Sequence, residues 1–210
     1  MTGPHDGWSR VSDRDELRRL LGRPTPRNAD KVRRRLHELD RAWLSRSPFC
    51  LVATSAADGS CDVSPKGDPP GFVVALDDTT VALPERKGNR RADGFLNLLG
   101  NPHVALLSLI PGRADTLRIN GRAEIVSDAP FMDAMAIAGR RPVLALVVHL
   151  HEVFFHCSKA PLRARLWAAE TWAPASAPSR AVISKTLEKP EASLAELERY
   201  YGPDYARNLY

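Results

Sequence analysis

The chain has 210 residues, of which 43% are hydrophobic and 26% are charged, which is typical of a globular protein with one substantial core. No apolar run approaches the roughly 18 residues of a membrane helix, and the polar N-terminus lacks the apolar segment of a signal peptide. We therefore expect a cytoplasmic protein. The net charge of +5 is small and only 7% of the residues are aromatic, so a specific anionic ligand deserves as much weight as nucleic acid.

The cysteine content excludes two kinds of stabilising site. There are three cysteines, an odd number, and none of them forms a CxxC motif: Cys50, Cys61 and Cys157. Both facts argue against a disulfide framework and against a structural zinc site. We expect three reduced thiols.

Two helices are predicted before residue 48. Residues 12–21 begin with an S-x-x-D capping pattern and end before Gly22. After the proline-containing segment RPTPRN, a second helix is predicted up to Leu44, because apolar residues recur at helical spacing: Val32, Leu36, Leu39 and Trp43.

From Pro48 onward the apolar pattern alternates, which is typical of strands. The sequence predicts three strand pairs: FCLVATSA with SCDVS around Asp58-Gly59, FVVALD with TTVAL around Asp77-Asp78, and HVALLSLI with DTLRINGRAEIV around Pro111-Gly112. PVLALVVHLHEVFFH is a long final strand.

Short helices are predicted between and after these strands. Residues 92–99 form a helix opened by Asp93 and stopped at Gly100, with one apolar side made of Phe95, Leu96, Leu98 and Leu99. Residues 128–139 also look helical, and SLAELERYYG follows the linker at 175–179 as a helical tail.

This order of elements indicates a fold that is mainly β with peripheral helices. Strands outnumber helices and follow one another through tight turns, without βαβ alternation. We expect an α+β protein built on an antiparallel β-barrel, since closure removes exposed strand edges. The predicted organisation is an N-terminal helical extension (1–47), the barrel (48–168), and a C-terminal linker and helical tail (169–210).

A concentrated positive segment, ERKGNRR, follows the second predicted hairpin and precedes the helix at 92–99. Cationic side chains, a flexible Gly88 and the free N–H groups of a helix start suit a phosphate or another anion, and arginine adds paired donors that match phosphate oxygens. The alternative is a solvated turn.

Two further segments carry residues that could contact a ligand. DVSPKGDPPGFV offers Ser64, Lys66 and Gly67 at the end of the first hairpin. TLRINGRAEI places Arg118, Asn120 and Arg122 on one face of a strand, because side chains alternate at period two. Such residues can bind a polar ligand, or they can form an ordinary exposed strand face.

Histidines and a cysteine near the end of the last predicted strand are candidates for metal and thiol chemistry. His149 and His151 share a strand face, and His156 lies on the other face unless a bulge intervenes. Two imidazoles need a third ligand to hold zinc, so we predict no metal site. Cys157 could act as a nucleophile, but a buried and inert thiol is the more frequent case.

Four segments taken in order resemble the pyridoxamine 5'-phosphate oxidase-like family of FMN-binding split β-barrels. They are SPFCLVATSAADGSCDVSPKGDPPGFV, LPERKGNRRADGFLNLLGNPHVALLSLIPG, TLRINGRAEI and VFFHCSKAPLRARLW, which lie between residues 48 and 168. The nearest likeness is to an uncharacterised branch that bears RxGNRR and HCxKA segments. True pyridoxamine-phosphate oxidases also carry a distinct C-terminal segment, which residues 170–210 do not match.

The resemblance implies a homodimer with FMN at the subunit interface. It implies phosphate and ribityl contacts from the basic run, here Arg86, Lys87, Gly88, Asn89 and Arg90. It places Ser64, Lys66 and Gly67 beside the flavin ring, with further polar contacts from Arg118, Asn120 and Lys159.

The function that follows is an FMN-dependent oxidoreductase acting on an unidentified small molecule. No acid–base pair in the sequence singles out a catalytic residue or a substrate. Two alternatives remain open: the same fold with F420 or haem as its cofactor, and a non-enzymatic ligand-binding protein. Binding to nucleic acid would call for aromatic residues among the cations, and Phe95 alone lies near the basic run.

Overall fold

The computed structural model describes residues 7–209 and divides into two compact units between Val32 and Arg33. The first unit holds α1 (Arg14–Leu21) and α2 (Pro26–Ala29). The carboxylate of Asp13 caps α1 by accepting a hydrogen bond from the Glu16 N–H at 2.8 Å. The predicted first helix is present, but its N-cap is Asp13 and not Ser12, the first residue of the S-x-x-D pattern. The predicted domain boundaries at residues 47 and 168 stay predictions.

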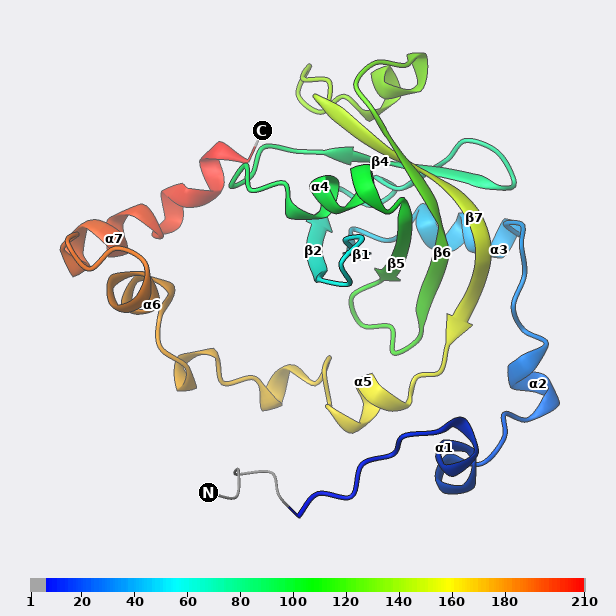
Figure 1. Cartoon of the computed structure of the whole chain (residues 1–210). Coiled ribbons are helices and arrows are strands. Elements are labelled where there is room, and N and C mark those ends of the chain that lie inside the picture. Colours follow the sequence, from blue (N-terminus) through cyan, green and yellow to red (C-terminus); the bar gives the residue numbers. More distant parts are fainter. Residues whose placement is uncertain (1–6, 210) are drawn as a thin grey trace. The chain divides into compact units, whose positions relative to one another are not determined.

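The second unit is built on one antiparallel sheet (Figure 1). Within the described residues the sheet has seven strands in the order β2-β1-β5-β6-β7-β4-β3. Its edges are β2 and β3, so the sheet does not close on itself. The predicted strand pairs are confirmed, as is the predicted class, mainly β with helices. The strands are β1 (Phe49–Ser55), β2 (Cys61–Gly67), β3 (Val74–Ala75), β4 (Thr80–Glu85), β5 (His103–Leu109), β6 (Thr116–Val126) and β7 (Leu144–His156).

Short helices flank the strands and continue beyond them. They are α3 (Glu38–Leu44), α4 (Asp93–Gly100), η1 (Pro130–Met135), α5 (Lys159–Arg163), η2 (Ala169–Thr171), η3 (Pro174–Ser176), α6 (Arg180–Leu187), α7 (Leu194–Tyr200) and η4 (Pro203–Asn208). Within residues 7–209, no helix combines the length and the apolarity that crossing a bilayer requires.

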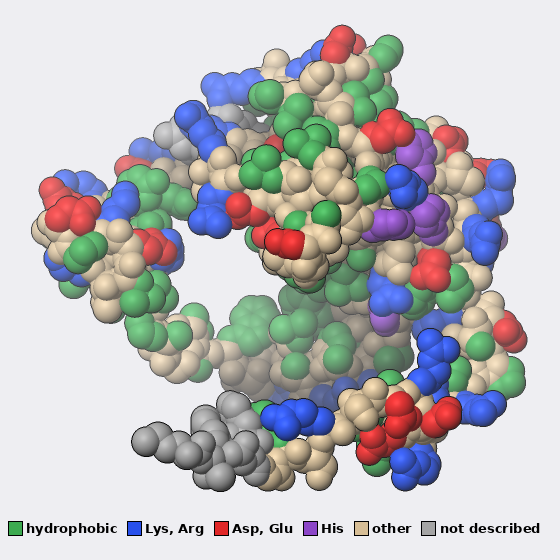
Figure 2. All heavy atoms as spheres, viewed as in Figure 1, with side chains coloured by type: hydrophobic (Ala, Val, Ile, Leu, Met, Phe, Trp, Pro, Cys, Tyr) green, Lys and Arg blue, Asp and Glu red, His purple; other side chains and the backbone are tan. Residues whose placement is uncertain are grey.

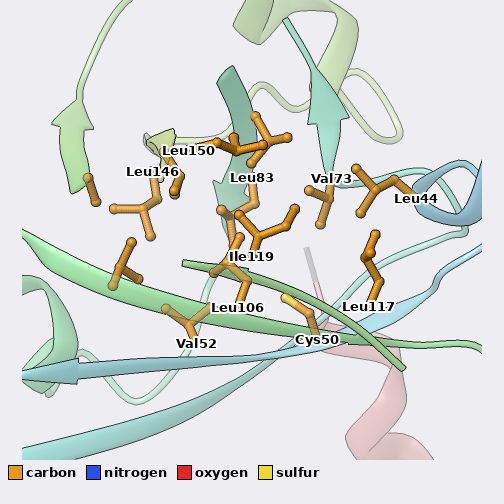
Figure 3. Close-up of a cluster of buried hydrophobic side chains, with 14 of the residues drawn as sticks. Leu44, Cys50, Val52, Val73, Leu83, Leu106, Leu117, Ile119, Leu146 and Leu150 are labelled. Atoms are coloured by element: carbon orange, nitrogen blue, oxygen red, sulfur yellow. The ribbon is translucent and has the colours of Figure 1, made fainter. Parts of the chain in front are cut away.

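One apolar cluster joins both halves of the sheet (Figure 3). Alternate side chains of five strands meet in it, and Leu44 of α3 and Leu98 of α4 cover it. Each such side chain contributes about 1.5–3 kcal/mol when it leaves water completely. The strand residues at its centre include Val52, Leu83, Leu106, Ile119 and Leu146.

The predicted helix over 32–44 is wrong in its first half. The backbone of Arg33 pairs with Val153, through hydrogen bonds of 3.1 and 2.7 Å. The helix starts only at the capping box of His37 and Asp40. The long-range backbone pairing therefore overrides a helical apolar pattern.

The helix predicted after the basic run is present, but its cap and apolar face differ from the prediction. The N-cap is Ala92 and no side chain caps the helix, while the C-cap is Asn101. Leu98 is buried, whereas Leu96 and Leu99 are 60% and 75% exposed. Successive helical residues point about 100° apart, so a helix this short buries one narrow stripe.

Two other helical predictions need correction. Residues 128–139 contain only the 3₁₀ helix η1, which ends at Met135 because Ala136 is extended, and the positive φ values of Ala138 (49°) and Gly139 (73°) continue the turn. The helix α6 was not predicted from the sequence, whereas the α7 region was.

A β-bulge interrupts the pairing of β6 with β7. Asn120 faces Glu152 and Gly121 faces Leu150, so His151 is the additional residue. A Cβ atom on Gly121 would lie 2.0 Å from the His149 carbonyl oxygen, so only glycine fits this position.

Candidate functional site

A cleft with a volume of about 1010 Å³ lies where β2, β4 and α4 meet. The helix α4 packs against β1 and β2, and the segment that joins β4 to α4 contributes residues 86–92 to the lining of the cleft. Apolar side chains form its floor, and these include Val52, Phe72, Leu83, Leu98 and Leu146. An apolar floor beneath a polar rim is typical of a small-molecule site.

Eight of the eleven predicted site residues line this cleft: Ser64, Lys66, Gly67, Arg86, Lys87, Gly88, Asn89 and Arg90. Arg118, Asn120 and Lys159 are not part of its lining. Segments that are distant in sequence, the end of β2 and the basic run, are thus brought together at one place.

Arg86 is engaged by groups of the protein itself. Its Nε donates to the Asp68 carboxylate at 2.6 Å, and its guanidinium also donates to the Met135 carbonyl oxygen at 2.6 Å. The Asp68 side chain is only 1% exposed. Arg86 therefore anchors the beginning of the basic run to the end of β2 and to η1.

The remaining cations of the run differ in whether they form an ion pair within the protein. Arg91 donates to Asp93 at 2.7 Å in an exposed pair. Lys87 and Arg90 form no ion pair with any residue in the described part of the chain. These two cations at the rim are the ones available to an anion.

The backbone at the start of α4 is strained. Arg90 and Ala92 have φ values of 63° and 57°, in the left-handed region that costs a non-glycine residue about 1–2 kcal/mol. The Asn89 side chain accepts a hydrogen bond from the Arg91 N–H at 3.0 Å. Where left-handed and right-handed residues alternate, successive backbone N–H groups point toward the same side. This arrangement is a common way to build an anion site.

Lys66 lies in the cleft beside a carboxylate and an aromatic ring. Its ammonium forms an ion pair with Glu85, and both side chains are largely buried. The same ammonium is 5.3 Å from the centroid of the Phe95 ring. Glu85 and Phe95 thus fix the position of the charge at the cleft wall.

A polar recess adjoins the cleft beneath α4. The Ser64 hydroxyl donates to Asp62 at 2.8 Å, and the Asn97 amide donates to the Thr54 hydroxyl at 3.1 Å. A Cβ atom on Gly94 would lie 3.1 Å from the Asp62 carboxylate, so glycine lets the helix approach closely.

Several residues of this cleft were not predicted from the sequence. Thr54 pairs with Asp62, and Ser64 and Lys66 follow Asp62 at period two, so the alternation used for Arg118 and Asn120 could have found both residues. Glu85, Arg91 and Phe95 also line the cleft, but no local signal marks them as partners of Lys66 or of an anion.

The three predicted residues outside the cleft lie elsewhere in the second unit. Arg118 and Asn120 face outward from β6, since the intervening Leu117 and Ile119 are buried in the core. The Arg118 guanidinium lies 4.5 Å from the Phe154 ring, and the Asn120 amide donates to Glu152 at 2.8 Å. Lys159 is the exposed first residue of α5.

Of the cysteines, Cys50 is buried, while Cys61 and Cys157 are exposed. Burial raises the pKa of the Cys50 thiol to about 12, although the charge of Lys66 acts in the opposite direction. The neutral form of this thiol is therefore strongly favoured, and Cys50 packs as a small apolar residue.

Histidine side chains gather over the region of β6 and β7 (Figure 2). His149 lies 3.1 Å from the Glu124 carboxylate, and the rings of His103 and His151 are 6.3 Å apart. Among residues 7–209, no group of three or more histidine, cysteine or acidic side chains has a geometry that could hold a metal ion.

Comparison with known proteins gives one sequence family and several similar folds. Residues 36–157 match the family model described as pyridoxamine 5'-phosphate oxidase. No curated protein matches the chain.

Three solved structures illustrate the similar folds. HupZ of Group A Streptococcus is 18% identical, with a TM-score of 0.46, over 57% of this chain and 93% of its own. General stress protein 26 of Bacillus anthracis is 14% identical, with a TM-score of 0.42, over 57% and 94% of the two chains. An F420 reductase is 20% identical, with a TM-score of 0.39, over 55% of this chain and 94% of its own.

The match to the family model spans more than half of the chain, and the protein therefore belongs to the pyridoxamine 5'-phosphate oxidase family.

Proposed function

We propose that the protein is an FMN-dependent oxidoreductase that acts on a small molecule as a homodimer, with FMN bound at the subunit interface. One observation carries this proposal. Lys87 and Arg90, two cations without an ion pair in the described residues, lie in the cleft next to a left-handed backbone at the start of α4. In a chain of this family, that arrangement suits the phosphate of FMN.

The cleft suits the rest of the molecule as well. Its apolar floor can receive a planar ring, and its volume of about 1010 Å³ accommodates a ligand the size of a mononucleotide. Lys66, held by Glu85, supplies a fixed positive charge deeper in the same cleft. Bound FMN would supply hydride or single-electron transfer, while the protein binds and orients it.

The residues of the basic run have different roles in this proposal. Arg86 keeps the run in place through Asp68 and the Met135 carbonyl oxygen. Lys87 and Arg90 then contact the phosphate directly, and Asn89 shapes the turn between them by accepting from the Arg91 N–H.

The test is the absorption spectrum of the purified protein, followed by titration with FMN and with riboflavin. We expect an oxidised-flavin spectrum, release of FMN on denaturation, and tighter binding of FMN than of riboflavin. Equal affinities would remove the phosphate site from the proposal. Binding of F420 or haem in place of FMN would change the cofactor, and binding of none of the three would leave a non-enzymatic role. Redox activity is then tested by reduction of the bound flavin and its reoxidation by candidate acceptors.

A further inference from the structure

A second, smaller cavity adjoins the cleft beside the ion pair of Arg86 and Asp68. It has a volume of about 170 Å³, and its lining comes from the segment after β2, from the end of β4 and from residues 134–137. Four residues line both the cleft and this cavity: Asp68, Phe72, Pro84 and Arg86. A molecule bound in the cleft can therefore extend a group into the smaller space, which we call the side cavity.

The floor of the side cavity is apolar and well packed. Phe72 and Met135 are 8% and 5% exposed, and they belong to two different apolar clusters of the core. Val74 packs against the second of these clusters, and Ile137 adds to the apolar lining. An apolar cavity of about 150 Å³ is large enough to bind benzene, so the side cavity has room for one ring or for a branched alkyl group of that size.

The wall formed by residues 68–71 has no backbone donor left for an anion. Pro69 and Pro70 carry no N–H group. The N–H groups of the other two residues, Asp68 and Gly71, donate to carbonyl oxygens just before β1 at 3.1 and 3.3 Å. Phosphate sites usually rely on unpaired N–H groups or on cations, and this wall supplies no such N–H group.

The opposite wall and the charged residues of the lining are engaged as well. The N–H groups of Ala136 and Ile137 donate to carbonyl oxygens of the same connection between β6 and β7, each at 3.1 Å. Arg86 and Asp68 pair with each other at 2.6 Å, and Arg86 also donates to the Met135 carbonyl oxygen. A guanidinium that is already matched by a carboxylate offers little net attraction to a second anion, so the side cavity favours an uncharged group.

We propose that the side cavity is a substrate subsite that takes a compact, uncharged and apolar group, such as a phenyl ring or a branched alkyl group of similar size. Anionic groups bind instead at the rim of the cleft, where Lys87 and Arg90 lie. The proposal rests on the proposed function for the identity of this ligand as the substrate, because that function places the cofactor in the adjoining cleft. It excludes a substrate whose phosphate has to enter the side cavity.

The test uses the full chain labelled with methyl-¹³C methionine. The chain has three methionines, so the spectrum contains few signals, and Met135→Leu assigns the signal of interest. Met135 lines the side cavity, whereas Met132 is fully buried in the same cluster and reports on the core. Phenol and inorganic phosphate are titrated separately, with and without FMN. We expect phenol to shift the Met135 signal saturably, with a Kd in the millimolar range, and phosphate to leave that signal unchanged.

A variant that fills the side cavity makes the test specific. Ala136 is part of the lining, so Ala136→Phe places a ring in the space that phenol would take. We expect this variant to weaken the binding of phenol at least about tenfold and to change the Kd for FMN less than about threefold. The matched control is Ala173→Phe, at an exposed position outside the cleft and the side cavity, which should change neither Kd. Circular dichroism and Tm confirm that each variant folds, and if Ala136→Phe fails to fold, Ala134→Leu replaces it.

Each contrary result has its own meaning. A Met135 signal that ignores phenol in a chain that binds FMN would overturn the subsite and leave the proposed function standing. Phosphate that shifts this signal and excludes phenol would make the side cavity an anion site. A signal that moves with protein concentration alone would mean that a second copy covers the cavity, and it would overturn the subsite too. Binding of phenol by a chain that binds no FMN would overturn the proposed function, and with it the substrate role of the side cavity.

Discussion

Arg86 and Asp68 form an ion pair in which the Nε of Arg86 lies 2.6 Å from a carboxylate that is only 1% exposed. This pair joins the first cation of the basic run to the end of β2. A positive run that looks uniform in sequence thus contains one residue that holds the loop and others that are free to meet a ligand.

The first prediction concerns the stability that this pair provides. Replacing Asp68 with alanine leaves the largely buried Arg86 without its carboxylate, so we expect the free energy of unfolding to fall by about 3 kcal/mol. Urea denaturation measures this loss. The control Asp93→Ala breaks the exposed pair with Arg91 and should cost no more than about 1 kcal/mol. Similar losses in both variants would show that Asp68 does not anchor the loop.

The second prediction separates the phosphate from the flavin ring. Replacing Arg90 with alanine removes a charge-assisted hydrogen bond, which corresponds to about a 10- to 100-fold weaker affinity for FMN. The affinity for riboflavin, which lacks the phosphate, should change less than about threefold. Fluorescence titration gives both constants, and Arg34→Ala, an exposed arginine outside the cleft, is the matched control. An equal loss for both flavins would remove Arg90 from the phosphate site.

The location of the site could be predicted from the sequence because its signals are local. Period-two alternation and the turn at Asp58-Gly59 define the first hairpin, and the basic run directly follows β4. The partners of the individual side chains could not be predicted, because Arg86 contacts Asp68 and Met135, which are distant in the sequence. The same applies to Arg33, whose backbone pairs with Val153 and prevents the helix that the local pattern favours.

The third prediction concerns the bulge between β6 and β7. A methyl group on Gly121 would lie 2.0 Å from the His149 carbonyl oxygen and 2.9 Å from its carbonyl carbon. Backbone atoms cannot move aside as a flexible side chain can, so we expect Gly121→Ala to cost about 3 kcal/mol or more. Thermal unfolding measures the loss.

The control for this substitution is Gly100→Ala at the end of α4, where an added Cβ atom meets nothing within 4 Å. That variant should be neutral or stabilised by up to about 1 kcal/mol, because alanine favours the helix. A Gly121→Ala variant as stable as the wild type would mean that β6 and β7 pair without this close approach.

The last prediction follows from the buried thiol of Cys50, whose pKa is raised from 9.0 to about 12 by burial. Below pH 9 the thiol is neutral in both the folded and the unfolded chain, so its contribution to stability does not change with pH. Above pH 9 the unfolded chain ionises while the folded chain does not, and this favours unfolding. Stability should therefore fall by up to about 1.4 kcal/mol per pH unit until about pH 12.

Denaturation of the wild type and of Cys50→Ala at several values between pH 8 and pH 11 isolates this contribution, because all other titrating groups are common to both proteins. We expect Cys50→Ala to be the less stable protein at pH 8, since it loses buried contacts, and the difference to narrow as the pH rises. Two curves that stay parallel over the whole range would show that the Cys50 thiol ionises as readily in the folded protein as in the unfolded chain, and that Lys66, opposite it on β2, offsets the effect of burial.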